Sequence, residues 1–535
     1  MAIPRGGFRS WLIVALVVGA LGSGAARADE ARLGTVSFEV ACNDGAQAAF
    51  DHAMALYHSF AWGPAAEAFD AVVNADPACG MAHWGRAMTT LGNPFVWPTG
   101  LSAEKLDAVK GMLDAARTAG LESEREQGYV AAVAAFVRDH ATVSQGQRMQ
   151  AYDDAMAALA ARHTGDVEAS ILSALVTSAN FDPADKGYAN QLAAAAVLEP
   201  IFKTLPDHPG VAHYLIHSYD YPPIAEHGLE AANAYAAIAP DAPHAQHMPS
   251  HIFTRLGLWR DSIAANRTSA RIAGDATFDG HHASDYMVYA YLQLAHDVAA
   301  EDAMAASLAM TPIDGFGAAF AYAAMPARLA LERGDWAAAA ALPLRPSAEA
   351  YPWSKYPHAE AINALARGIG AALTGDGAAA RDQHARLIAL RDATQALKLA
   401  YWIEQVDIQA AIVGALALCA EGADAACLDA LAEAAMREDA TEKHAVTPGP
   451  LVPARELLAD ALLRLDRPAE ALAEYEAVLA KEPNRFRALA GAMTAARLAG
   501  ETAKARALAA ELVAQGAEGD GARAALDEAK VLAGG

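Results

Sequence analysis

Several common sequence features are rare or missing in this chain of 535 residues. Alternating runs of β-branched residues are missing while alanine is abundant, so helix is predicted nearly everywhere. There is no G-x-S-x-G elbow, no phosphate loop ending in Gly-Lys-Ser/Thr, no strand followed by G-x-G-x-x-G, and no H-E-x-x-H. The sequence therefore predicts an all-α protein, and it leaves any catalytic residue unknown.

Basic residues are scarce. The chain has 40 Lys and Arg against 64 Asp and Glu, which gives a formal net charge of −24. So acidic a protein is a poor candidate for binding nucleic acid or an anionic membrane. Beyond the N-terminus, no stretch reaches the roughly 18 uncharged apolar residues that a membrane span needs. We therefore expect no nucleic-acid partner and no membrane span.

Only four cysteines are present. Cys42 precedes the first predicted helix pair and Cys79 opens the third helix, while Cys419 and Cys427 flank a tight connection between helices. The C-x-x-C spacing of thiolate metal sites is absent, which favours disulfides over a metal site. Of the three connectivities that four cysteines allow, we predict the local pairs Cys42–Cys79 and Cys419–Cys427.

Residues 1–28 have the pattern of a signal peptide. Arg5 and Arg9 supply the positive start, a short apolar run follows, and Ala26-Arg27-Ala28 is a small-residue cleavage pattern. The mature chain is then expected to begin near Asp29, with a formal charge of −27 after the loss of three arginines. This predicts an exported protein, periplasmic or secreted, in an oxidising compartment where disulfides form.

A histidine pair recurs at intervals of 34 residues. His213 and His217 recur as His247 and His251, and then as His281 with Asp285. Within each pair the two residues are four apart, so on a helix they share one face. We call these six residues the histidine ladder. The ladder predicts a site shared by three neighbouring helices.

Other residues at the same period carry a family resemblance. Ala65, Phe69 and Pro77 match the small, aromatic and proline positions of a 34-residue helix–turn–helix unit. A second copy runs over residues 452–483, and Gly257-Leu258-Trp259 matches the turn between the two helices. The chain resembles the tetratricopeptide repeat (TPR) family, and its His-Met-Pro-Ser-His-Ile-Phe block is similar to one in secreted bacterial TPR proteins. The resemblance implies an α-solenoid of TPR-like repeats.

Breaks in the repeat register predict the organisation of the chain. After the signal peptide we expect an N-terminal TPR solenoid with a histidine-lined groove at 29–307, a link at 308–319, middle helical repeats at 320–436, a linker at 437–453 and C-terminal TPR repeats at 454–535.

The resemblance also implies where the ladder lies. In TPR proteins the first helix of each repeat lines a concave groove, and repeat starts near 209, 243 and 277 place the ladder on groove positions. His244 joins the ladder in this register. The further groove candidates are Asp220, Tyr221, Arg255 and Tyr289.

Histidine pairs on one helix face are typical metal ligands. Imidazole suits zinc, copper or iron, and the ladder offers neither thiolate nor thioether for a soft copper(I) site. We therefore predict one or two transition-metal ions bound by the ladder residues and His244. An open coordination position there would support a metal-dependent hydrolase or oxidase acting on a small molecule or peptide in the groove.

The alternative is a metal-free groove that captures a peptide or protein partner, as a scaffold or adaptor, with the histidines as polar or pH-sensitive contacts. Metal binding predicts that the imidazole nitrogens come within about 4–5 Å of a common point, whereas peptide binding predicts that they spread along the groove. Pro249 is expected to start or kink the second ladder helix. His282 is expected to point away from the ladder, and His58 and His444 are interpreted as packed or solvated residues.

Overall fold

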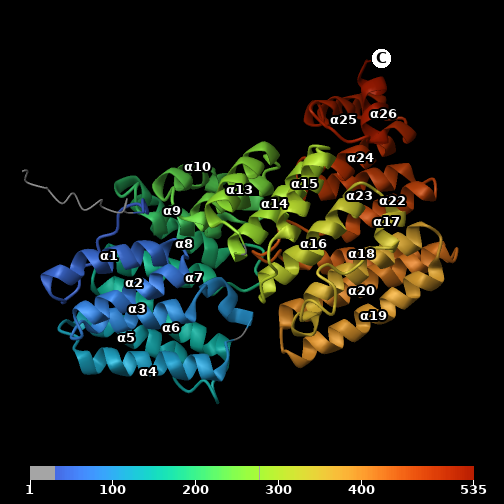
Figure 1. Ribbon diagram of the computed structural model, residues 1–535. Helices are drawn as coiled ribbons and strands as arrows, with labels where there is room; N and C mark the ends of the chain where they lie inside the picture. The colour runs from blue at the N-terminus through green and yellow to red at the C-terminus, as the bar shows by residue number, and fades with distance from the viewer. Residues whose placement is uncertain (1–30, 100, 276, 535) are drawn as a thin grey trace, which may run out of the picture. The chain divides into compact units, whose positions relative to one another are not determined.

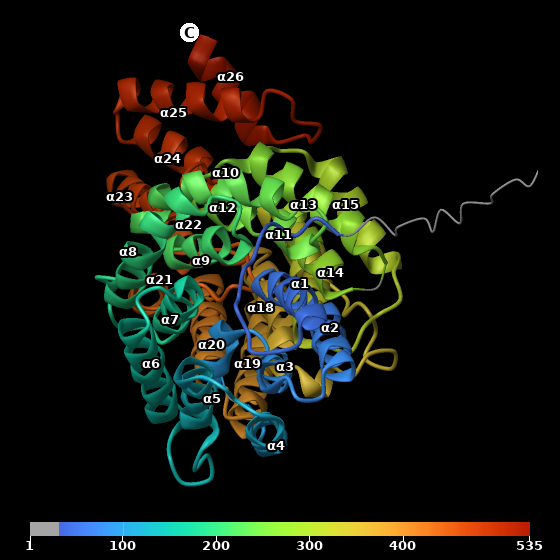
Figure 2. The same cartoon turned by 90° about the vertical axis from the view of Figure 1, so that its left-hand side faces the viewer.

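Consecutive helices joined by short turns build the part of the chain that the structure describes. The computed structural model describes residues 31–99, 101–275 and 277–534, and residues 32–534 belong to one compact unit. The predicted signal peptide lies outside the described residues. The described residues contain no strand, and most of their helices pack on the next helix along the chain (Figures 1 and 2). The predicted all-α, TPR-like solenoid is confirmed.

The first repeat packs as its signature residues predict. Ala65 and Phe69 are fully buried, and a Cβ added to Gly85 of the next helix would lie 2.3 Å from the Phe69 ring. Glycine at this position therefore allows the two helices to approach closely. The helices of this part are α1 (Asp44–His58), α2 (Trp62–Ala75), α3 (Gly80–Leu91), the 3-10 helix η1 (Pro94–Thr99), α4 (Ala103–Ala119), α5 (Glu124–Val137), α6 (Gln145–Arg162), α7 (Val167–Ala179) and α8 (Ala189–Thr204).

The ladder helices follow. They are α9 (Pro209–Tyr219), η2 (Pro222–Gly228), α10 (Leu229–Ile238), α11 (Pro243–His247), α12 (Pro249–Arg255), α13 (Trp259–Ala273), α14 (Phe278–Gln293), α15 (Asp297–Ala309) and α16 (Phe316–Glu332). Helix α11 ends before Met248 because Pro249 has no N–H to continue the hydrogen-bond pattern. Met248 nevertheless keeps helical dihedral angles (φ −53°, ψ −37°), so the chain stays helical across the break.

The remaining helices include α20 (Ala400–Ala420), which is long and apolar. They are α17 (Trp336–Ala340), η3 (Trp353–Lys355), α18 (Pro357–Leu373), α19 (Gly377–Ala396), α20 (Ala400–Ala420), α21 (Asp424–Ala440), α22 (Ala454–Arg464), α23 (Pro468–Lys481), α24 (Phe486–Leu498), α25 (Thr502–Gln515) and α26 (Ala524–Gly534). By length and composition alone α20 could cross a membrane, but half of its apolar window is buried and it packs against α18, α19 and α21. An interior helix of a helical protein meets the same criterion.

Both predicted disulfides are present. Cys42–Cys79 ties the segment before α1 to the start of α3, and Cys419–Cys427 joins the end of α20 to α21. The local pairing predicted from the sequence is confirmed, and no described cysteine is free.

The segment 441–453, between α21 and α22, lies against the ladder helices. Arg328 of α16 donates a hydrogen bond to the backbone carbonyl of Gly449 at 3.0 Å. Nearer its start, Lys443 Nζ donates to Asp220 Oδ2 at 2.9 Å. A residue more than 200 positions away in the sequence therefore joins the loop that follows α9.

Candidate metal centre

Six histidines form two neighbouring groups of three. Triad 1 consists of His213, His217 and His244, and triad 2 of His247, His251 and His282. In each triad, one nitrogen from each ring lies within 4.8 Å of those of the other two. The triads adjoin, since the ring centroids of His244 and His247 are 6.1 Å apart. The convergence expected of metal ligands is met within each triad.

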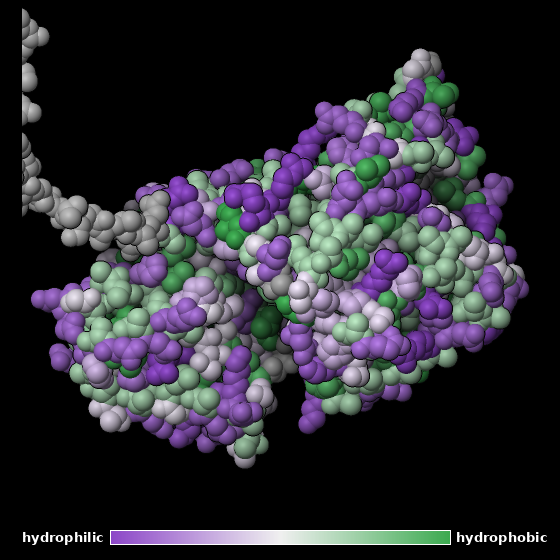
Figure 3. All heavy atoms as spheres, viewed as in Figure 1, coloured by the Kyte–Doolittle hydropathy of each residue, from purple (hydrophilic) through white to green (hydrophobic). Residues whose placement is uncertain are grey.

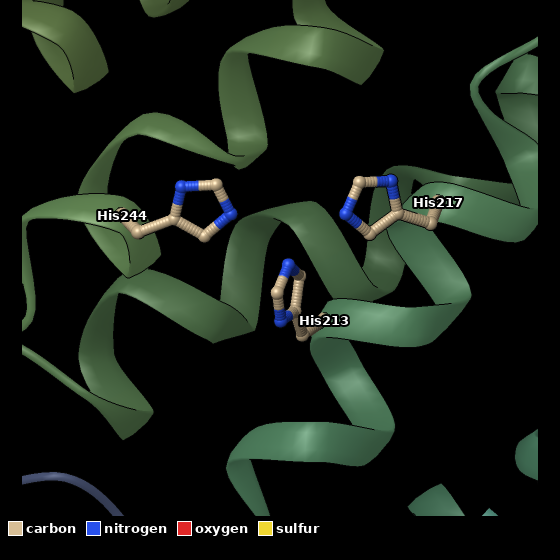
Figure 4. Close-up of side chains that lie close together, drawn as sticks. All are labelled: His213, His217 and His244. Atoms are coloured by element: carbon tan, nitrogen blue, oxygen red, sulfur yellow. The ribbon is translucent and has the colours of Figure 1, made fainter. Parts of the chain in front are cut away.

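Triad 1 comes from α9 and α11 (Figure 4). His213 and His217 lie one turn apart on α9, and His244 lies in the first turn of α11, so it is not on the preceding loop. All three Nε2 atoms are buried without a hydrogen-bond partner among the described residues. His213 Nδ1 lies 2.6 Å from the carbonyl oxygen of His58, which only accepts. Neutral His213 therefore carries its proton on Nδ1 and keeps a lone pair on Nε2, the form that a metal ligand needs.

Triad 2 comes from α11, α12 and α14. His247 Nδ1 lies 2.6 Å from Asn266 Oδ1, and His251 Nδ1 lies 2.8 Å from Asp220 Oδ2. Asn266 Nδ2 donates to the carbonyl oxygen of Ser262, which orients its Oδ1 toward His247. Both rings therefore donate from Nδ1, and their Nε2 atoms face each other at 3.0 Å.

Burial keeps these imidazoles neutral. It is the largest influence on all six and lowers the pKa of each below the ordinary histidine value, well below for every member except His251. For His251 the nearby Asp220 carboxylate offsets part of the effect of burial. Neutral imidazole is the form that binds a metal ion.

Asp220 connects triad 2 to two cations. Its Oδ1 accepts from Arg255 Nε at 2.8 Å, and its Oδ2 accepts from His251 and from Lys443. Burial raises the pKa of Asp220, but Lys443 and Arg255 outweigh it and hold that pKa well below its usual range. Burial also lowers the pKa of Lys443 to about 8. The ionised carboxylate orients His251, as acceptors behind metal-bound histidines commonly do.

The third ladder pair does not join the centre, which corrects the sequence prediction. His281 lies with Nδ1 2.8 Å from Ser307 Oγ and Nε2 2.9 Å from the Tyr322 hydroxyl. Asp285 Oδ1 accepts from Arg328 Nε at 3.0 Å. Both residues therefore face α15 and α16, on a different face of α14 from the one that carries His282.

His282 takes the place predicted for His281, and the expectation that it points away was wrong. Neighbouring residues on a helix point about 100° apart, because one turn takes 3.6 residues. The face of α14 toward triad 2 carries His282 and Tyr286, at an offset of 35 residues from His247 and His251. The sequence therefore contained the signal for His282, as an offset of 35 residues from His247, but the histidine ladder used only the offset of 34 that leads to His281.

Two of the other groove candidates lie beside the triads, and one lies elsewhere in the fold. Arg255 is committed to Asp220, and Tyr221 is buried beside it. Tyr289 lies apart, because its hydroxyl donates to Glu482 and accepts from Arg485 near the C-terminal repeats.

Five of the six triad histidines are buried and His244 is partly exposed, so the triads do not line an open concave surface as the resemblance implied. They reach solvent-accessible space through His217 and Asp220, which line a cavity of about 510 Å³. Figure 3 shows a hollow between the helices of the first repeats and those around α18–α20, with apolar atoms inside it. The ring of His217 stacks on Phe95, with centroids 4.0 Å apart, at this cavity.

A third buried group was not foreseen from the sequence. Glu168 bridges two rings, with His58 Nε2 at 3.1 Å and His208 Nε2 at 2.9 Å, and the Tyr214 hydroxyl lies 2.8 Å from His58 Nδ1. Burial raises the pKa of Glu168, but the two histidines outweigh it and bring that pKa to about 2. Hydrogen bonds satisfy His58, so this group supports the backbone that holds His213.

Comparisons with known proteins give no family. No family model matches the chain, and no curated protein is significantly similar to it. The structure of Naa15/Naa10 bound to HypK-THB is similar at 13% identity and a TM-score of 0.25, over 91% of this chain and 73% of that one. The crystal structure of the APC/C hetero-tetramer Cut9-Hcn1 is similar at 10% identity and a TM-score of 0.31, over 91% and 90%. The description of this fold therefore rests on its own helix pairs.

Proposed function

We propose that this helical-repeat protein binds two transition-metal ions, one in each histidine triad. The observation that carries the proposal is the approach of His247 Nε2 to His251 Nε2 at 3.0 Å while both Nδ1 atoms face oxygen acceptors. With the protons on Nδ1, two lone pairs point at one another. Two nitrogens bound to one ion at about 2.0–2.1 Å each lie roughly 3 Å apart, so a shared cation accounts for this approach.

Protonation is the competing way to relieve that repulsion. A proton on one Nε2 would create an imidazolium ion in a fully buried site, and burial lowers the pKa of both rings. The cations Lys443 and Arg255 lower the pKa of His251 further. Moving the proton of His247 from Nδ1 to Nε2 would leave Asn266 Oδ1 without its donor, and the same move in His251 would set a lone pair on Nδ1 against the Asp220 carboxylate. Both changes are costly in a buried site. A metal ion leaves both Nδ1 protons on their oxygen acceptors, and its bonds to the imidazole nitrogens offset the cost of placing its charge in a buried site.

The ligand set favours zinc, copper or iron. All six ligands are imidazoles, and thiolate and thioether are absent from the triads. Three protein nitrogens per ion leave a coordination position open, which is the arrangement of catalytic sites rather than closed structural ones. Triad 1 has the cavity beside it, so we assign it the reactive ion and triad 2 the buried, supporting ion. A metal-activated water would support hydrolysis of a small molecule, and a redox-active ion would support its oxidation.

The alternative of a metal-free peptide groove has less support. Peptide binding predicted imidazoles spread along an open surface, whereas the rings of each triad converge and five of the six are buried. Export of the protein remains part of the proposal, and two disulfides fit an oxidising compartment.

The proposal is tested by adding metal to chelator-treated protein without a histidine tag. Zinc, copper(II) or iron(II) should raise the melting temperature in a concentration-dependent way, because an ion that binds only the folded state stabilises it. A His217→Ala/His251→Ala double variant, with one ligand removed from each triad, should lose most of this shift. An unchanged melting temperature with every ion would contradict the proposal.

A further inference from the structure

The cavity beside triad 1 has apolar walls. Aromatic rings line it from four separate elements: Phe95 of η1, Phe181 after α7, Tyr221 after α9 and Tyr401 of α20. Sites of this size that hold small molecules are typically apolar with a few placed polar groups. The walls therefore fit a ligand with an aromatic or similarly flat apolar body.

The charged groups at this cavity favour an anion. Each lining carboxylate is already paired with a cation: Glu442 with Lys186, Glu404 with Arg437, and Asp220 with both Lys443 and Arg255. Two cations therefore pair with the single negative charge of Asp220, which leaves an excess of one positive charge. A bound divalent ion in triad 1 would add two further positive charges next to the same space.

Lys443 is the cation best placed to meet a ligand. Its side chain is 5% exposed and lines the cavity with His217. Its Nζ carries three donors, and the described residues give it one acceptor, Asp220 Oδ2. A buried ammonium group with unused donors favours an oxygen anion that can accept them.

We propose that the cavity binds an organic carboxylate with an aromatic body, held by Lys443 and directed at the metal position of triad 1. This inference rests on the proposed metal site and names the class of substrate for it. The ring lies among Phe95 and the other aromatic side chains, and the carboxylate accepts from Lys443 Nζ.

The test is calorimetric titration of the full chain with benzoate, with benzylamine as the probe of opposite charge. Both chelator-treated and zinc-loaded protein are used. Benzoate should bind and benzylamine should not, and zinc should strengthen benzoate binding. Lys443→Gln should weaken benzoate binding about tenfold, the loss expected for one hydrogen bond to a charged group. Phe181→Leu should weaken it while leaving zinc content unchanged, and Lys355→Gln, exposed and outside the cavity lining, is the matched control.

The outcomes separate this inference from the proposed function. If the protein binds zinc but binds benzoate and benzylamine equally well, or does not bind benzoate, the carboxylate inference is overturned and the metal site is still supported. Benzoate binding that depends on Lys443 in a protein that takes up no zinc, copper(II) or iron(II) supports the carboxylate site and contradicts the metal site. Equal benzoate affinity in Lys443→Gln and Lys355→Gln contradicts the role of Lys443.

Discussion

The Nε2 atoms of His247 and His251 lie 3.0 Å apart, and an oxygen acceptor lies behind each ring. Asn266 and Asp220 fix the two protons on Nδ1, so both lone pairs are directed at the same small space. Such oxygen partners behind histidine ligands fix the ring orientation and raise its basicity. The pair is therefore arranged in advance for a cation.

Adjacent histidines on α14 give a matched test of the centre. His282→Ala should remove the ion bound by triad 2, because it deletes one of three ligands. His281→Ala should retain full metal content and lose about 1–3 kcal/mol of stability, because its partners Ser307 and Tyr322 are left unsatisfied. Metal per chain by elemental analysis distinguishes them. Equal metal loss in both variants would show that α14 does not present His282 to an ion.

The residue behind His247 should tune metal affinity without being a ligand. Asn266→Leu removes the acceptor at Nδ1 and should weaken binding at triad 2 by about 10- to 100-fold. Asn363→Leu, which removes a buried hydrogen bond to the carbonyl oxygen of Leu342, is the matched control. Competition with a coloured chelator measures the affinity. Unchanged affinity in Asn266→Leu would mean that the tautomer of His247 is not set by this contact.

Metal-free protein should lose stability in acid. The unfolded chain takes up a proton on each triad histidine as the pH falls through about 6.5, whereas burial keeps the native rings neutral because their pKa is lowered. Stability is therefore present above about pH 6.5 and declines below it, by up to about 1.4 kcal/mol per pH unit for each ring.

Urea unfolding at several pH values checks this. His282→Gln should make the dependence of the unfolding free energy on pH shallower by about 1.4 kcal/mol per unit between about pH 6 and pH 5. Exposed His227→Gln is the control for replacing a histidine by glutamine. An unchanged slope in His282→Gln would indicate that this ring is protonated in the native state.

The two disulfides should contribute unequally to stability. Cys42–Cys79 spans 37 residues and Cys419–Cys427 spans 8. Because a longer closed loop restricts the unfolded chain more, replacing both cysteines by alanine should cost about 4 kcal/mol for the first pair and about 2.5 kcal/mol for the second. Denaturant unfolding of the two double variants gives the order, and a reversed order would contradict this account.

The sequence predicted what depends on local periodicity. Packing of Ala65 and Phe69 holds the helices of the first repeat together, as their TPR-like spacing predicts. Helices α9 and α11 begin at Pro209 and Pro243, where the repeat register predicted helix starts. The pairs on α9 and on α11–α12 followed from the same spacing, since four residues make about one turn.

What could not be predicted depends on rotation and on distant contacts. Whether His281 or His282 faces triad 2 depends on how α14 is rotated after its connection to α13, and a shift of one residue moves a side chain by about 100°. Lys443 reaches Asp220 from 223 positions away. His58, interpreted as an ordinary packed residue, provides the carbonyl that orients His213. No spacing within one repeat encodes such contacts.

Elemental analysis of untagged protein, beside the His217→Ala/His251→Ala variant, tests the central claim most directly. We expect about two transition-metal ions per chain, one per triad, and their loss in the variant. Protein that contains no metal, and that takes up none when zinc, copper(II) or iron(II) is supplied, would contradict it.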